Sequence, residues 1–171
     1  MADYHSTAVI QPDLPLAGVS PLERLLLDAM IQTEINGEGL YCFFEQSYTS
    51  DVELNIGDLR KAVAASVGFE SQLRPAIDLW LAKIADEGED AYAVLDFDAH
   101  LDELAYTVIL QDVVRRSPAL TYVTVCGAHT CTKMRIDGFG GFAAFITANV
   151  IRWISTDTWL EAQFADLGIE G

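Results

Sequence analysis

The sequence predicts an α+β fold in which an antiparallel sheet of about five to six strands packs against about five helices. Residues 120–149 have the β-branched and aromatic composition of consecutive strands, and Asp137-Gly138 suits a two-residue hairpin turn. Helical and strand-like segments elsewhere lack the regular alternation of a parallel sheet. We therefore expect residues 1–171 to form a single α+β domain.

The first third of the chain is expected to form an arm and a helix. Residues 1–19 contain two prolines and no helical period, which predicts an extended arm or an edge strand at Ser6 to Ile10. Ser20 is the expected N-cap of a helix, with Pro21 in the first turn and a capping box completed by Glu23. Asn36-Gly37 is expected to end this helix.

The middle third is expected to form a hairpin, two helices and a further strand. The second of these helices has the clearer pattern, because apolar residues recur at helical spacing from Leu73 to Ile84. The predicted strands are Gly39 to Gln46, Val52 to Ile56 and Ala91 to Phe97, and the predicted helices are Asp58 to Val67 and Ser71 to Ala85.

In the last third, a helix capped by Asp98 is expected to run to Arg116 and to end at Ser117-Pro118. Predicted strands follow at Leu120 to Cys126, Cys131 to Ile136 and Phe139 to Asn149, the last prolonged or bent at Val150 to Ile154. Because both faces of residues 139–149 are apolar, we expect this strand to be covered on each side.

A terminal helix is expected after Ser155 or Thr156, ending at Gly168, with Leu160, Phe164 and Leu167 turned inward. The glycines around Phe139 allow either a bulge or a close backbone approach. A phosphate cradle is the less favoured interpretation, because such a loop should precede a helix and here it precedes a strand.

Composition restricts the class of protein. Fifty-one per cent of the residues are apolar and 21% are charged, as in folded globular proteins. No apolar run has the length of roughly 18 residues that a membrane span needs, and the N-terminus has no secretory signal pattern. Three cysteines cannot all pair within the chain, which favours a reducing compartment. We expect a cytoplasmic protein that is not bound to a membrane.

The acidic charge is unevenly distributed. The net charge is −16, and residues 1–114 hold 21 acids and five bases, whereas residues 115–171 hold five of each. Such a field repels nucleic acids and attracts basic surfaces, although plain solubility is the competing explanation. The residues expected to form one acidic, partner-binding face are Asp86, Glu87, Glu89, Asp90, Asp96, Asp98, Asp102, Glu103 and Asp112. Asp51, Glu53 and Asp58 are candidate neighbours of that face.

A second candidate site lies at residues 96–102. In an extended segment, Asp96, Asp98, His100 and Asp102 would share one face and could hold Mg²⁺, Mn²⁺ or Zn²⁺ for water activation. If Asp98 instead caps a helix, these side chains diverge, and a capping aspartate is the more common arrangement. We therefore expect no metal or other cofactor, with a small metal-dependent hydrolase as the alternative.

Two thiols and an imidazole occur within six residues, at Cys126, His129 and Cys131. A zinc site would also need Cys42, and a Cys-His nucleophile would need an orienting third group that the sequence does not supply. Buried cysteines acting as small apolar residues are the favoured interpretation. Motifs for phosphate loops, serine hydrolases and zinc proteases are absent from the sequence, and basic residues are not interleaved with aromatic ones as in nucleic-acid-binding proteins.

Three segments, SPLERLLL (20–27), QDVVRRSPALTYVTV (111–125) and TCTKMRIDGFGGFAAFITA (130–148), resemble an uncharacterised alphaproteobacterial family carried on plasmids and other mobile elements. The resemblance implies no catalytic residues, but a mobile-element setting favours anti-defence roles. We therefore expect an acidic, non-enzymatic inhibitor that imitates nucleic acid and binds the basic surface of a host DNA- or RNA-handling protein. A structural or assembly subunit with an apolar contact patch is a further hypothesis.

Overall fold

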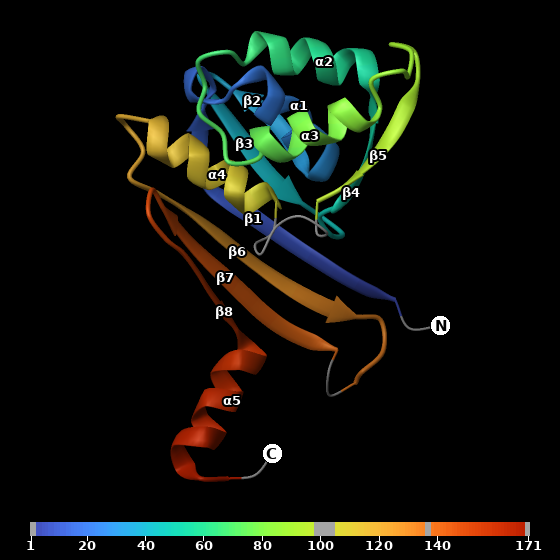
Figure 1. The fold of residues 1–171 in the computed structure, drawn as a ribbon. Helices are drawn as coiled ribbons and strands as arrows, with labels where there is room; N and C mark the ends of the chain where they lie inside the picture. Colours follow the sequence, from blue (N-terminus) through green and yellow to red (C-terminus); the bar gives the residue numbers. More distant parts are fainter. Residues whose placement is uncertain (1–2, 98–104, 136–137, 170–171) are drawn as a thin grey trace.

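The computed structural model describes residues 3–97, 105–135 and 138–169. These residues confirm the α+β class, with a six-stranded antiparallel sheet, a two-stranded sheet and five α-helices (Figure 1). The strands are β1 (Tyr4–Pro15), β2 (Gln32–Asn36), β3 (Gly39–Phe44), β4 (Asp51–Asn55), β5 (Tyr92–Asp96), β6 (Tyr122–Cys131), β7 (Phe139–Thr147) and β8 (Ile151–Ser155). The helices are α1 (Pro21–Met30), α2 (Ile56–Ala65), α3 (Arg74–Lys83), α4 (Ala105–Arg116) and α5 (Thr156–Leu167), with a short 3₁₀ helix at Leu16–Gly18.

The N-terminal segment is an interior strand of the large sheet, whose order is β2-β3-β1-β6-β7-β8. The prediction of an arm or an edge strand was therefore wrong. Ala8, Ile10 and Leu14 of β1 face the core and are buried. Pro12 is tolerated because the register against β3 shifts between Ile10 and Leu14, and Pro15 is the last residue of the strand.

The first predicted helix is divided in the structure. Its start is confirmed, because the Ser20 hydroxyl accepts from the backbone N–H of Glu23 and the Glu23 side chain accepts from the N–H of Ser20. The helix stops at Met30, and the following residues form β2 in a hairpin with β3. Gly37, at φ +60°, is part of the turn of that hairpin rather than a helix end.

The segment from 120 to 149 contains two long strands where three were predicted. β6 and β7 pair without a register break, from Tyr122 opposite Thr147 to Thr130 opposite Phe139. Residues 132–135 are not a strand, and Asp137 lies outside the described residues. β6 extends further than expected because its second half pairs with β1 on one side and with β7 on the other.

Helices α1 to α4 lie on one side of the large sheet and cover it over the upper half of the view in Figure 1. Side chains from this inner face, the four helices and the β4–β5 pair form the core. α4 is buried from Ala105 to Val114, which explains why its sequence has the composition of a strand. None of the described helices is long and apolar enough to cross a membrane.

The other face of the large sheet, called the outer face below, is not covered by any described helix. It includes Val9 of β1, Tyr122 of β6 and Phe145 of β7, which are 39%, 46% and 43% exposed. The expectation that residues 139–149 are covered on each side was therefore wrong, because only Ala144 and Ile146 of this strand are buried.

α5 projects from the end of the sheet that is furthest from the other helices (Figure 1). Its caps were predicted correctly, with Ser155 at the start and Gly168 at the end. Its packing was not, since no residue of α5 is buried. Leu160, Phe164 and Leu167, which were expected to face inward, are 39%, 41% and 70% exposed.

Candidate partner-binding surface

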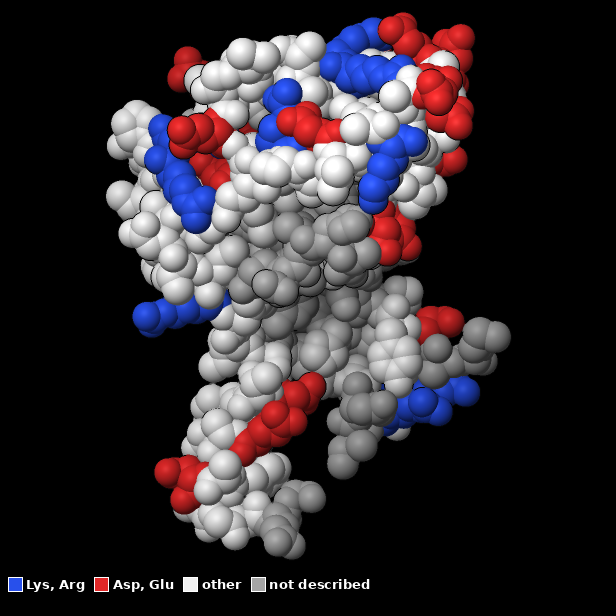
Figure 2. Space-filling model, in the orientation of Figure 1, with Lys and Arg blue, Asp and Glu red and all other residues white. Residues whose placement is uncertain are grey.

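Acidic side chains gather on β4, β5 and the loop between α3 and β5. Of the predicted acidic face, Asp86, Glu87, Glu89, Asp90 and Asp96 are described and exposed. Asp51 and Glu53, proposed as neighbours from the sequence, are exposed on the adjoining strand β4. These seven residues are called the acidic surface below. Figure 2 shows a cluster of acidic atoms at the upper right, where Figure 1 places β5 and the loop before it.

The β4–β5 pair, called the ribbon below, forms one part of the acidic surface, and the loop before β5 forms the other. One set of alternating side chains, including Val52, Leu54 and Leu95, is buried in the core. The other set points outward and places Asp51 directly opposite Asp96, with Glu53 opposite Val94. The ribbon therefore presents two carboxylates side by side on its outward face.

The acidic loop is fixed through its backbone carbonyl groups. The guanidinium of Arg60 on α2 donates to the carbonyls of Glu87, Ile84 and Ala85 at 3.1, 3.3 and 3.3 Å. The N–H of Gly57 donates to the carbonyl of Glu89 at 3.0 Å. These bonds hold the loop against the start of α2 and leave its carboxylates free to point outward.

Close approach of the loop depends on a glycine. A Cβ added at Gly57 would lie 2.8 Å from the carbonyl oxygen of Glu89, which is too close for a carbon atom. The adjacent N–H of Ile56 donates to the carbonyl of Ala91 at 2.9 Å. The first turn of α2 thus provides both the space and the donors that position the loop.

Most of the acidic surface is not neutralised by lysine or arginine. Asp51, Glu53, Asp86, Glu87, Glu89 and Asp90 form no ion pair with another described residue. Arg60, which reaches the loop from α2, is occupied by backbone carbonyls. The ion pairs of the described chain are elsewhere: Arg24–Asp28, Lys61–Asp58, Arg74–Asp78, Arg115–Asp112 and Arg116–Glu23.

One predicted member does not belong to this surface. Asp112 is 2% exposed on α4, where it accepts from the backbone N–H of Gln72 at 2.7 Å and pairs with Arg115 at 3.3 Å. Helical periodicity turns it into the protein rather than outward. Three further members, Asp98, Asp102 and Glu103, lie outside the described residues.

The candidate metal site falls mostly in the undescribed part of the chain. Asp96 is exposed at the end of β5, and Asp98, His100 and Asp102 lie outside the described residues. Within residues 3–97, 105–135 and 138–169, there is no group of three or more histidine, cysteine, aspartate or glutamate side chains that could hold a metal ion.

The sheet separates Cys126 from His129 and Cys131. Cys126 is exposed on the outer face, whereas Cys131 is buried on the side of His129, because alternate residues of β6 face opposite ways. Cys42 is buried in the core, and desolvation raises the pKa of its thiol to about 12. The expectation of buried, apolar cysteines is confirmed for Cys42 and Cys131 and is wrong for Cys126.

The glycines of β6 and β7 make room for rings on the neighbouring strand. Gly140 lies opposite His129, and a Cβ built at Gly140 would lie 2.4 Å from that imidazole. Gly127 lies opposite Phe142, whose ring would be 2.2 Å from an added Cβ. Of the two expected arrangements, the close approach is confirmed and the bulge is wrong, since the register is unbroken.

Comparisons with known proteins were negative. Neither a protein-family model, nor a curated protein, nor a solved structure matches this chain. The acidic surface therefore has to be interpreted from its own geometry.

Sequence reasoning found the acids but missed what positions them. Arg60 reaches carbonyls that are 24 to 27 residues further along the chain, and Gly57 contacts the same loop. A lone arginine and a lone glycine inside a predicted helix give no signal of such a role. Only the fold brings the start of α2 beside the acidic loop.

Proposed function

We propose that this protein is a non-enzymatic inhibitor that uses the acidic surface to occupy a basic, nucleic-acid-binding site on another protein. The observation that carries the proposal is the exposed group of carboxylates on β4, β5 and the preceding loop, six of which have no ion pair within the described chain. Regularly placed carboxylates can substitute for phosphates in front of lysine and arginine side chains.

Two features of the surface support a binding role over plain solubility. The loop is held rigidly by Arg60 and by the first turn of α2, so its carboxylates are presented in a fixed arrangement. Asp51 and Asp96 lie opposite one another on the outward side of the ribbon, which places two carboxylates side by side. Solubility alone does not require a fixed loop. The resemblance to a mobile-element family fits an inhibitor of host defence.

The test is capture of proteins from a host lysate, at about 0.05 M and about 0.5 M salt, because the attraction should weaken as salt rises. We expect DNA- or RNA-binding proteins to be captured at low salt and released at high salt. Added duplex DNA or RNA should compete for them. A variant with Asp86→Asn, Glu87→Gln, Glu89→Gln and Asp90→Asn should lose this capture.

The matched control removes four exposed acids elsewhere, through Asp3→Asn, Glu34→Gln, Glu38→Gln and Glu70→Gln. It has the same net charge as the loop variant, so it should retain capture if placement matters. Equal loss of capture in both variants would show that capture depends on net charge and not on the position of the carboxylates. Recovery of no nucleic-acid-binding protein at low salt would contradict the proposal.

A further inference from the structure

The outer face of the large sheet carries an apolar row that crosses five strands. Phe43 of β3 is opposite Val9 of β1, Val9 is opposite Cys126 of β6, Cys126 is opposite Ala143 of β7, and Ala143 is opposite Ile154 of β8. None of these five residues is buried. The row is a continuous apolar strip left open to solvent.

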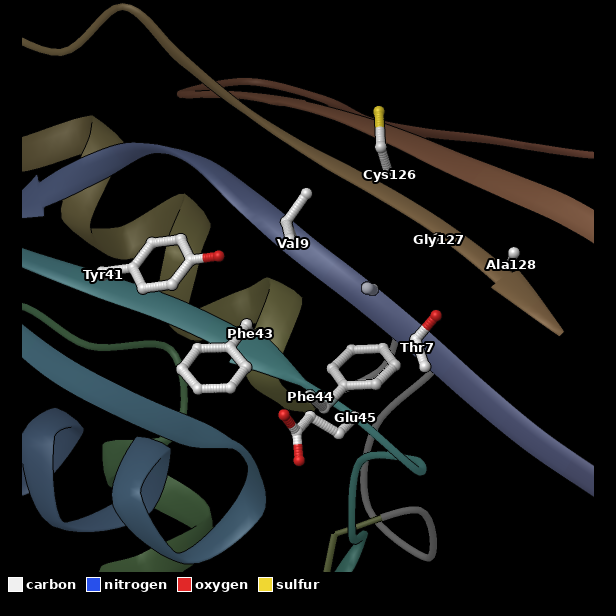
Figure 3. Close-up of a pocket in the computed structure, with 10 residues that line it drawn as sticks. Thr7, Val9, Tyr41, Phe43, Phe44, Glu45, Cys126, Gly127 and Ala128 are labelled. Atoms are coloured by element: carbon white, nitrogen blue, oxygen red, sulfur yellow. The ribbon is translucent and has the colours of Figure 1, made fainter.

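This strip is hollowed into a trough. Two cavities, of about 620 and 410 Å³, meet at Cys126 and Gly127. Figure 3 shows the first cavity, with Val9 and Cys126 rising from neighbouring strands and the rings of Tyr41 and Phe43 along β3. Small residues form the floor of the trough, and larger ones form its sides. The floor includes Gly127, Ala128, Gly141 and Ala143, and the sides include Tyr41, Phe43, Ile154 and Trp159.

The trough ends at the first turn of α5, a helix that has no buried residue. Thr156 is joined to Gly141 of β7 by hydrogen bonds of 2.8 and 3.2 Å, and Trp159 lines the second cavity. Beyond this turn, Leu160, Phe164 and Leu167 form an exposed stripe at helical spacing. A helix of this length is marginal in water without tertiary contacts. α5 therefore needs a surface to pack on.

Electrostatic complementarity favours the trough of a second copy of this chain as the surface on which α5 packs. α5 carries Asp157, Glu161 and Asp166 and no lysine or arginine. Three bases lie near the trough, Arg152 on the outer face of β8 and Lys133 and Arg135 in the connection from β6 to β7, and one acid, Glu45, lines the first cavity. An acidic helix with an apolar stripe thus matches an apolar trough with basic residues beside it.

We propose that two copies of this chain associate by exchange of α5, each helix lying in the trough of the other copy. A helix that leaves the sheet at the edge of its own trough is placed to reach a second molecule, and the reciprocal arrangement is the two-fold symmetric contact typical of homodimers. The proposal does not depend on the acidic surface, which lies on β4, β5 and the loop before β5.

The first test is the oligomeric state of the full chain, measured by sedimentation velocity from about 1 to about 100 µM, the range of a micromolar association. We expect a dimer at the upper end. Leu160→Asp with Phe164→Asp should give a folded monomer, because neither residue is buried in the described structure. Ala143→Asp in the floor should weaken the dimer at least about tenfold.

The second test locates the contact through Cys126, the exposed thiol in the floor. Single variants Leu160→Cys, Phe164→Cys and Leu167→Cys are oxidised with diamide, which accepts the two electrons and two protons released as the disulfide forms. We expect at least one of them to give a disulfide-linked dimer that Cys126→Ser abolishes. Ala162→Cys is the matched control, since helical geometry places this residue on the opposite side of α5.

Three outcomes would overturn the proposal. The first is a chain that stays monomeric throughout the concentration range. The second is a dimer that persists in the Leu160→Asp, Phe164→Asp variant, which would place the contact elsewhere. The third is a disulfide from the stripe to Cys126 that forms within one chain, which would mean that α5 folds back into its own trough.

Discussion

Arg116, at the end of α4, donates from Nη2 to Oε2 of Glu23 in the first turn of α1, at 2.6 Å. The Glu23 side chain is fully buried. Arg116 also donates to the carbonyl of Gly18 at 3.0 Å and lies over the ring of Phe69. One guanidinium therefore ties together α4, α1 and the segment before α1.

Arg116→Met is expected to lower the free energy of unfolding by about 3–5 kcal/mol, because it leaves the Glu23 carboxylate buried without its cation. Urea denaturation measures the change. The control is Lys61→Met, which breaks the exposed pair with Asp58 and should cost less than about 1 kcal/mol. Similar losses in both variants would mean that the Arg116 pair is no more than a surface contact.

Arg60→Ala is expected to loosen the acidic loop while lowering global stability by only about 1–2 kcal/mol, because the three carbonyls involved can bind water instead. Cleavage by a glutamate-specific protease after Glu87 or Glu89 should become faster. Lys61→Ala, on the same helix, changes the charge equally without touching the loop and should leave cleavage unchanged. A loop cut at the wild-type rate in Arg60→Ala would show that other contacts hold it.

Gly140→Ala is expected to destabilise the sheet by about 1–3 kcal/mol, since the added methyl group would meet the imidazole of His129. The cost should largely disappear in a His129→Ala background, which a double-mutant cycle by urea denaturation would measure. Gly127→Ala should behave differently, because its Cβ would also lie 2.6 Å from the backbone carbonyl of Thr7. Removal of the Phe142 ring should therefore not rescue it.

Stability is expected to fall as the pH rises above 9. Burial raises the pKa of the Cys42 thiol from 9.0 to about 12, so the unfolded chain ionises this thiol in a range where the folded chain keeps it protonated. The free energy of unfolding should then decrease between pH 9 and pH 12, by at most about 1.4 kcal/mol per pH unit for this group. Burial also raises the pKa of Tyr106, which adds a loss in the same direction.

Urea denaturation at pH 8 and pH 10.5 would measure this loss. Cys42→Ala removes the contribution of the thiol. The free energy of unfolding should therefore decrease less between pH 8 and pH 10.5 in this variant than in the wild-type protein. An equal decrease in both proteins would assign the effect to other groups.

The sequence predicted the elements with strong local signals and missed those determined by distant neighbours. The capping box at Ser20 and the caps of α5 depend on adjacent residues, so they were predicted correctly. Residues 32–36 continue the preceding helical pattern and become a strand only because β3 pairs with them. For the same reason, the second half of β6 could not be recognised without β1 and β7.

The sequence also predicted only part of the candidate site. A run of acids between two elements is visible in any sequence, and Asp86 to Asp90 are exposed as expected. Asp112 occurs in the same run but lies on the buried face of α4, which only the packing of α4 determines. The open outer face was missed because apolar residues on both sides of a strand usually indicate two covered faces.

The interior position of β1 affects the order in which the sheet can be completed. Gln11 pairs with Thr124, 113 residues further along the chain, so β1 must wait for a strand that is synthesised much later. Until then one row of its backbone N–H and C=O groups has no native neighbour. A nascent chain that stalls before β6 would expose this edge to other chains, and misassembly during synthesis should concentrate there.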